Sequence, residues 1–330
     1  MAYTDQDLDD AVKAGVVSAK HVAAFRHFMQ NQRNGTASSE EHFRMITGFN
    51  DVFVTIACLL VLAAGWYIGS FANDQVGALA AAAGSWGLAE YFTRIRRMAL
   101  PSITLLMVFV TAAFATFDFI ADGPLLVLPP LAAMLAAAGH WLRFRVPITI
   151  AAVAASGIVA VMALMTEMEI DLDGPLFSGV LLALGLMTLG LAIWWDSRNV
   201  HRITRQADVA FWLHILSSFV IVHTLFSNIL LRETQSDGMV ITIVLLAYGL
   251  LTLVSIILDR RAMMVSALGY ALYATGHVFT TDNAEGLGFA LACLIVGGGL
   301  LMLSALWSKV RKPVVGLLPH AMASRLPPAY

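Results

Sequence analysis

Apolar stretches of about twenty residues recur along almost the whole chain. As α-helices rising ~1.5 Å per residue, stretches of this length cross the ~30 Å hydrocarbon core of a membrane. Charged residues make up 13% of the 330 residues and hydrophobic ones 59%, whereas a soluble protein has about a quarter charged residues. The sequence therefore predicts an all-α, polytopic membrane helix bundle. Its ten predicted transmembrane helices cover residues 51–71, 75–92, 99–120, 124–142, 146–166, 175–195, 208–231, 239–258, 262–281 and 287–307.

Basic residues sort into alternate connections between these helices. With the N-terminus on the inner side, all of the 20 Lys and Arg residues except Arg232 fall on that side. The opposite side collects acids, such as those of TEMEIDLDG at residues 166–174. Because short cytoplasmic loops of membrane proteins concentrate Lys and Arg, this pattern predicts that both termini are cytoplasmic. Adding or removing one helix would invert every later loop and destroy the pattern.

The predicted domain organisation has four parts. Residues 1–33 form a cytoplasmic amphipathic helical head, 34–49 a polar linker, 50–308 the ten-helix membrane domain and 309–330 a cytoplasmic tail. The first fifty residues lack the basic start, apolar stretch and cleavage site of a secretory signal peptide. The first apolar stretch is therefore expected to be an uncleaved anchor.

The ten helices are expected to form five hairpins that each leave from and return to the inner side. Four outer loops place an acid and a glycine just before an inward-running helix, as in DGPLL at residue 122 and DGPLF at residue 173. Such a repeat is typical of internal duplication. Convergence on good capping explains it as well, because an acid stabilises a helix N-terminus and glycine permits the turn.

The head has an apolar face that needs a partner. Two short amphipathic helices bury little area alone, so this face is predicted to dock on the membrane surface, another subunit or a soluble protein. The residues of the predicted docking face are Val22, Phe25, Phe28 and Met29. Nucleic acid is not an expected partner, because the aspartates of the first predicted helix would repel phosphate.

The stretch GLAEYFTRIRRMALPS, residues 87–102, places opposite charges beside the second predicted helix. Glu90 and Arg94 are four residues apart, and Arg97 would extend the same helical face. These three residues form a possible polar cluster at the cytoplasmic face, and the alternative is a hinge whose arginines anchor the first hairpin. An interfacial enzyme would need Glu90 to converge with Asn50, Asp51, Asp208 or the arginine loops. No catalytic motif is present, so we expect no enzymatic activity.

Histidines are the ionisable residues immersed most deeply in the predicted helices. His223 and His277 lie toward the outer side of two helices that run in the same direction, so a shared metal or haem site is geometrically allowed. The alternative, which we favour, is that each histidine hydrogen-bonds a neighbouring helix. Cys58 and Cys293 lie far apart in apolar stretches, which predicts neither a metal pair nor a disulfide. No cofactor is therefore expected.

Three segments resemble a group of known proteins. LDDAVKAGVVSAKHVAAF, FRMITGFNDVFV and LAEYFTRIRRMALPS are similar to uncharacterised bacterial polytopic inner-membrane proteins that carry a short cytoplasmic helical head. The resemblance covers the head and the first two hairpins best. It implies a location in the bacterial cytoplasmic membrane, and it supplies no established activity or site.

Two functions from different classes follow from these features. The scarcity of immersed polar groups and the unpartnered head favour a non-catalytic subunit, assembly factor or sensor of a membrane complex, whose head docks a protein partner or a second copy. The alternative is a transporter of neutral or hydrophobic substrates, because carriers of drugs and metabolites share the ten-helix topology. The parallel hairpin repeat and the lack of broken helices at matching positions weigh against such a carrier.

Overall fold

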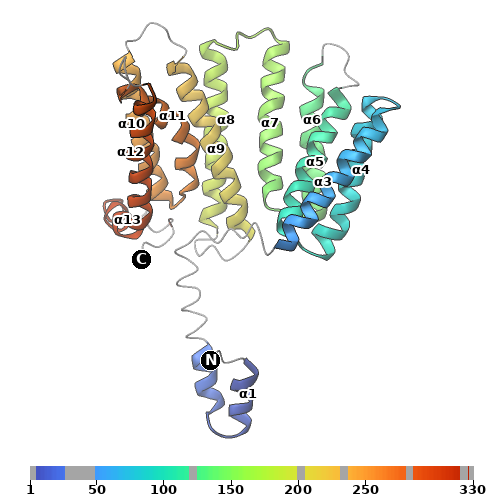
Figure 1. The fold of residues 1–330 in the computed structure, drawn as a ribbon, viewed down its shortest axis with the longest axis vertical. Helices are drawn as coiled ribbons and strands as arrows, with labels where there is room; N and C mark the ends of the chain where they lie inside the picture. The colour runs from blue at the N-terminus through green and yellow to red at the C-terminus, as the bar shows by residue number, and fades with distance from the viewer. Residues whose placement is uncertain are drawn as a thin grey trace. The chain divides into compact units, whose positions relative to one another are not determined.

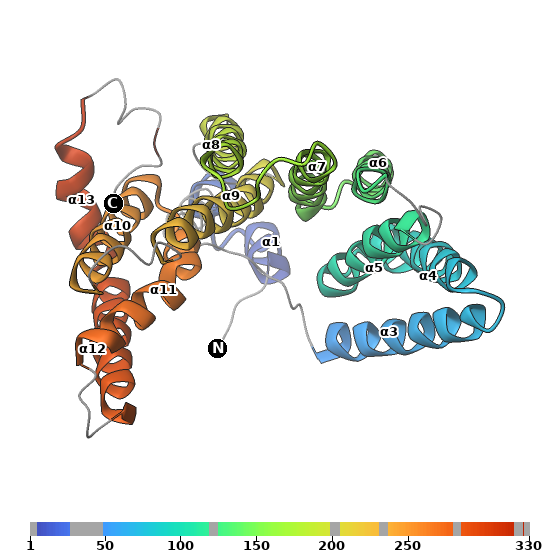
Figure 2. The ribbon, with the colours of Figure 1, turned by 90° about the horizontal axis from the view of Figure 1, so that it is seen from above.

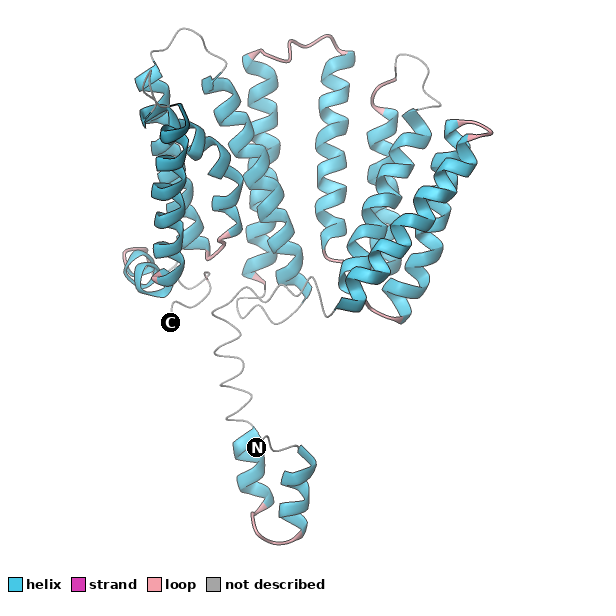
Figure 3. Cartoon of the chain, in the orientation of Figure 1, coloured by secondary structure: helices cyan, strands magenta, loops and turns pink. Residues whose placement is uncertain are grey.

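A computed structural model describes residues 5–26, 49–118, 125–198, 205–230, 237–279, 285–319 and 326. Throughout these ranges the regular secondary structure is helical (Figure 3). The chain divides into two compact units, Met1–Phe43 with the final residue, and Arg44–Ala329. Residues 1–33 of the predicted head lie in the first unit and residues 50–308 of the predicted membrane domain in the second. Each unit is described by itself.

The head is a pair of short helices. Helix α1 (Asp5–Lys13) ends before Gly15, whose φ of 72° lies in the left-handed region that glycine adopts without strain. Residues 19–26 form a second helix, and the backbone N–H of His21 donates to the Ser18 hydroxyl at 3.3 Å as in an N-cap. Arg26 Nη2 lies 3.0 Å from Asp9 Oδ1 and joins the two helices. Val22 is only 3% exposed, so it contributes to the small interior of the head.

Every predicted membrane stretch coincides with a helix of the second unit. The helices are α3 (Phe49–Ser70), α4 (Asp74–Ala89), α5 (Ala99–Asp118), α6 (Leu128–Phe144), α7 (Ile148–Glu167), α8 (Pro175–Ser197), α9 (Arg205–Leu230), α10 (Asp237–Leu258), α11 (Ala262–Phe279) and α12 (Glu285–Ala305). A six-residue π-helix, η1 (Glu90–Ile95), extends α4, and α13 (Trp307–Gly316) follows α12. The bounds match the predicted stretches to within a few residues.

Helix lengths and composition identify a multi-pass membrane protein. Among the described residues, six helical segments are long and apolar enough to cross a membrane: Phe49–Ser70, Ala99–Asp118, Ile148–Glu167, Pro175–Ser197, Gln206–Phe226 and Leu287–Ala305. A shorter apolar segment covers Thr242–Leu258. Helix α6 begins four residues later than expected because Pro129 and Pro130 occupy its first turn, where proline has no N–H to lose.

The helices of the membrane unit pack side by side, as a row. Helices α3, α4 and α5 pack on one another, α5 packs on α6, α6 on α7, α7 on α9, and α9 on both α8 and α11 (Figure 2). Helix α11 also packs on α10 and α12. Separate clusters of buried apolar side chains lie along this row, for example Cys58, Leu62, Ala89 and Leu105 between α3, α4 and α5. Cys58 is therefore a packing residue, whereas Cys293 is exposed.

Successive helices alternate in direction, so the turns that follow η1, α6 and α10 lie at one edge of the row (Figure 1). This is the edge that carries Arg97, Arg145 and Arg260, and we call it the arginine edge. Arg97 and Arg145 both have a φ of 54°, and Asp259 one of 55°. A single left-handed residue is a common way to end a helix, so three turns at the arginine edge share one local geometry.

Candidate functional site

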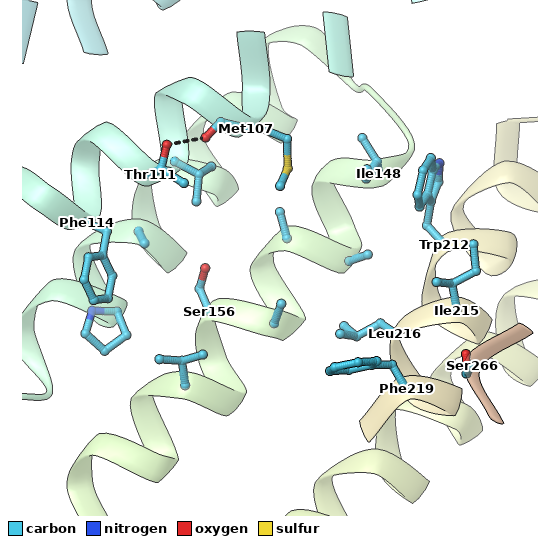
Figure 4. Close-up of a pocket in the computed structure, with 17 residues that line it drawn as sticks. Met107, Thr111, Phe114, Ile148, Ser156, Trp212, Ile215, Leu216, Phe219 and Ser266 are labelled. Atoms are coloured by element: carbon cyan, nitrogen blue, oxygen red, sulfur yellow. Dashed lines mark hydrogen bonds between the residues drawn. The ribbon is translucent and has the colours of Figure 1, made fainter. Parts of the chain in front are cut away.

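A large apolar groove lies between α5, α6, α7, α9 and the beginning of α11. Its volume is ≈ 520 Å³, and Met107, Phe114, Ile148 and Trp212 are among the side chains that line it (Figure 4). The hydroxyls of Thr111, Ser156 and Ser266 are the lining side-chain oxygens. Thr111 donates its hydrogen bond to Met107 O at 2.8 Å in its own helix. The groove therefore suits an apolar occupant.

A second cavity of ≈ 340 Å³ lies between α3, α4 and α5. It is lined by apolar side chains such as Leu59, Trp66 and Val108, and it shares Thr111 with the large groove. The two hollows thus lie on either side of α5, and the large one is the stronger candidate for binding.

Glu90 is the centre of an ionic cluster at the arginine edge. Arg143 donates two hydrogen bonds to it, from Nε to Oε1 at 2.6 Å and from Nη2 to Oε2 at 3.0 Å. Arg94 Nη1 donates to Oε2 at 3.2 Å. These contacts join η1, which begins after the last residue of α4, to the end of α6. The hydrogen bond from Arg143, and then that from Arg94, lower the pKa of Glu90.

The sequence spacing suggested that Arg97 extends the helical face of Glu90 and Arg94. In the structure it does not. The helical structure ends at Ile95, and Arg97 lies in the following turn with a left-handed backbone. The other two predicted interfacial acids lie in the first turns of their helices, Asp51 in α3 and Asp208 in α9. The cluster that the described contacts assemble is therefore Glu90 with Arg94 and Arg143.

A second ionic network joins α8, α9 and the turn before α11. Arg260 donates two hydrogen bonds to Asp196, from Nε to Oδ2 at 3.1 Å and from Nη2 to Oδ1 at 2.5 Å. His214 Nε2 lies 3.1 Å from Asp196 Oδ2, and Arg260 also donates to Ala207 O at 3.3 Å. His214 is fully buried and Arg260 is 3% exposed. A buried arginine needs such a partner, because an unpaired charge away from water is costly.

Asp259 and Arg261, on either side of Arg260, contact helix α13. Asp259 Oδ1 accepts a hydrogen bond from Trp307 Nε1 at 2.7 Å and lies 3.6 Å from Arg311 Nε. The Arg261 guanidinium lies 4.9 Å from the centre of the Trp307 ring. Burial lowers the pKa of Arg311, and Asp259 opposes that shift. The turn at residues 259–261 thus connects α8 and α9 to α13.

His140 is fully buried without a hydrogen-bond partner for either ring nitrogen among the described residues. Its ring packs between Phe144 at 4.5 Å, Phe109 at 5.9 Å and Trp86 at 6.1 Å, measured between ring centres. Neither of the two grooves reaches it. An imidazole surrounded by aromatic rings is a packing element whose polar atoms cost stability.

His223 contacts a neighbouring helix. Its Nδ1 lies 2.9 Å from the Tyr270 hydroxyl, and its ring stacks on Phe219 at 6.0 Å. The side chain of His277 lies outside the described residues, so the proposed pairing with His223 stays untested. Within the described part of the chain, no group of three or more His, Cys, Asp or Glu side chains could hold a metal ion.

The predicted docking face of the head is described in part. Phe25 is 49% exposed, whereas Val22 is buried inside the head. Phe28 and Met29 lie outside the described residues. Of the two described residues of this set, Phe25 is the one whose ring is available to a partner.

Sequence reasoning missed Arg143, Asp196, Arg260 and His140 as parts of sites. Each partner pair is far apart in the chain: 53 residues separate Glu90 from Arg143, and 64 separate Asp196 from Arg260. Asp196 carried a signal, since it is an acid in the last turn of an apolar helix. No protein-family model, curated protein or solved structure matches this chain.

Proposed function

We propose that this protein is a non-catalytic subunit, assembly factor or sensor of a membrane complex, and that its head docks a partner. The observation that carries the proposal is the position of the charged residues in the membrane unit. Along the described helices α3–α12, every Asp, Glu, Lys and Arg lies near a helix end. The ionic networks of Glu90 and Asp196 brace those ends.

Several threonine hydroxyls farther inside the helices are satisfied locally. The hydroxyls of Thr188, Thr224 and Thr275 each donate to a carbonyl four residues earlier in the same helix, at 2.7–2.8 Å. A path for a polar solute would need such groups to face it instead. This arrangement favours a protein that holds other molecules in the membrane over one that conducts polar solutes across it.

The head supplies the proposed contact with a protein partner. It is a compact unit of its own, and its described residues include the buried side chain of Val22 and the exposed ring of Phe25. A unit that buries so little area gains stability by binding. The partner is a different protein or a second copy of this chain.

Gentle purification of the full chain tests this proposal. We expect a stoichiometric protein partner, or a dimer, that is lost when residues 1–35 are deleted and weakened in Phe25→Ser. Asp10→Asn serves as the control, because Asp10 is an exposed residue of α1. A monomer that binds nothing before and after the deletion would contradict the proposal.

We further propose that all ten helices α3–α12 cross the cytoplasmic membrane of a bacterium, with both termini inside. The arginine edge supports this topology, because cytoplasmic loops are rich in Lys and Arg. Single cysteines at Arg145 and Asp171, placed in a variant without Cys58 and Cys293, should react with an impermeant thiol reagent from opposite sides. Labelling of both from the same side would contradict this topology.

The apolar groove favours one alternative, a carrier of neutral or hydrophobic substrates. A carrier would move an apolar solute between the two sides through the hollow beside Trp212. Uptake of a fluorescent hydrophobic compound into proteoliposomes, abolished in Ala155→Phe, would support it. Equal accumulation in liposomes with and without the protein would exclude transport of that compound.

A further inference from the structure

We propose that the large groove holds one acyl chain of an anionic phospholipid from the leaflet on the side of the arginine edge. The groove runs along α7 from Ile148, in its first turn, to Val159. Eleven steps of 1.5 Å give a length of about 16 Å along α7. That length is about half of the ~30 Å hydrocarbon core, the depth of one leaflet.

A linear hydrocarbon chain can lie along the groove, because its volume of ≈ 520 Å³ extends over about 16 Å of α7. A helix of a partner or of a second copy, ~10 Å across with its side chains, would cover the same face and leave no retained lipid.

The walls of the groove match an acyl chain chemically. The small side chains of Ala152 and Ala155 of α7 line the groove together with larger aromatic side chains. These are Phe114 of α5 and Trp212 and Phe219 of α9 (Figure 4). Helices α5 and α9 stand on either side of α7 (Figure 2). Burying methylenes against such surfaces is favourable compared with water, and close packing adds to the retention of one chain.

A positive charge lies where the headgroup would be. Arg145 is exposed in the turn just before α7, three residues from Ile148. Arg143 in the same region is paired with Glu90, whereas no carboxylate of the described residues pairs with Arg145. An anionic phosphate at this edge therefore complements Arg145, and the groove and the charge together define a lipid site.

Native mass spectrometry of the full chain tests the site. The protein is reconstituted in nanodiscs that contain equal amounts of phosphatidylglycerol and phosphatidylcholine and is then released into mild detergent. We expect one retained phosphatidylglycerol per chain. Ala155→Phe fills the groove and should abolish retention, and Arg145→Gln should lower it about fivefold and remove the headgroup preference.

Two matched variants control for the substitutions. Ala64→Phe adds the same ring at an exposed position of α3 that lines neither groove, and Lys312→Gln removes an exposed charge of α13. Both should retain lipid as the unmodified protein does. Equal retention in Ala155→Phe and the unmodified protein, or equal retention of both lipids by the unmodified protein, would overturn the proposal.

A second measurement serves if Ala155→Phe does not fold. Lipid with brominated acyl chains quenches the fluorescence of nearby tryptophan residues. After transfer of the protein to detergent, the bulk lipid is removed, and the residual quenching comes from the retained chain. Trp212→Phe should remove this residual quenching, whereas Trp194→Phe, which changes an exposed ring outside the groove, should keep it. Residual quenching that persists in Trp212→Phe would overturn the proposal. Deletion of residues 1–35 leaves the groove intact, so lipid retention and partner docking fail independently.

Discussion

Arg260 and Asp196, 64 residues apart, form a two-point ion pair in which the arginine is 3% exposed. Removal of one member of a buried pair leaves the other charge uncompensated and costs about 3–5 kcal/mol. We therefore expect Asp196→Asn to lower the stability of the membrane unit by about that amount, with further loss at the His214 contact. Thermal unfolding in detergent, followed by circular dichroism, measures the change.

A double variant separates the charge from the packing. Replacement of both partners by apolar residues removes the uncompensated charge, and such swaps are often neutral. Asp196→Leu combined with Arg260→Met should therefore be more stable than Asp196→Asn. Asp171→Asn, in the exposed turn between α7 and α8, is the control for loss of a carboxylate. A melting temperature of Asp196→Asn equal to that of the unmodified protein would show that another group compensates Arg260.

The pair between Glu90 and Arg143 should be weaker and dependent on pH. Both side chains are about a third or more exposed, so solvent screens their attraction. Because the hydrogen bond from Arg143 lowers the pKa of Glu90 below 4.5, the pair stabilises the protein above that pH and is lost as pH falls through the lowered pKa. Glu90→Gln should therefore melt slightly below the unmodified protein at neutral pH.

Melting curves taken from neutral pH to well below 4.5 check this expectation. The difference between Glu90→Gln and the unmodified protein should vanish at the acidic end. Arg143→Gln should have a slightly smaller effect than Glu90→Gln, which also loses the contact with Arg94. The double variant should add little to Glu90→Gln, because the pair between Glu90 and Arg143 is lost in all three. Additive effects would mean that the two residues act separately. Abundance in the membrane should stay nearly normal.

The positions of the helices could be predicted from the sequence because the bilayer fixes their length. A helix that crosses ~30 Å of hydrocarbon needs about twenty apolar residues, and that signal is continuous in the chain. The sorting of basic and acidic residues into alternate loops likewise distinguished the arginine edge from the opposite edge of the row. Local spacing also predicted that Glu90 and Arg94 pair, since residues four apart are neighbours on any helix.

The sites could not be predicted in the same way because they depend on which helices are neighbours. Nothing in the spacing of Glu90 and Arg143 states that η1 packs beside the end of α6. Arg260 looked like one more basic residue of a loop, and its burial follows from the docking of α8 and α9 against that turn. The apolar groove likewise arises from side chains of several helices, none of which is unusual in its own sequence.

Glycines at the crossing of α3 and α4 should be intolerant of side chains. A Cβ added to Gly77 would lie 2.7 Å from Trp66 O, and one added to Gly69 would lie 2.8 Å from the Gly77 Cα. Gly77→Ala should therefore destabilise the protein by about 1–3 kcal/mol through forced backbone shifts. Gly65→Ala is the matched control, because a Cβ there meets nothing within 4 Å. Equal melting temperatures of the two variants would contradict this tight crossing.

Replacement of His140 should stabilise the protein. Its ring nitrogens are buried among Trp86, Phe109 and Phe144 without a hydrogen-bond partner among the described residues, and burial of unpaired polar atoms is costly. His140→Leu should therefore raise stability by about 1 kcal/mol in thermal unfolding. His214→Leu should act in the opposite direction, because His214 contacts Asp196. A lower melting temperature of His140→Leu would contradict this prediction. It would show that the imidazole makes a stabilising polar contact in the membrane, and partner binding and lipid binding by this variant would then be measured.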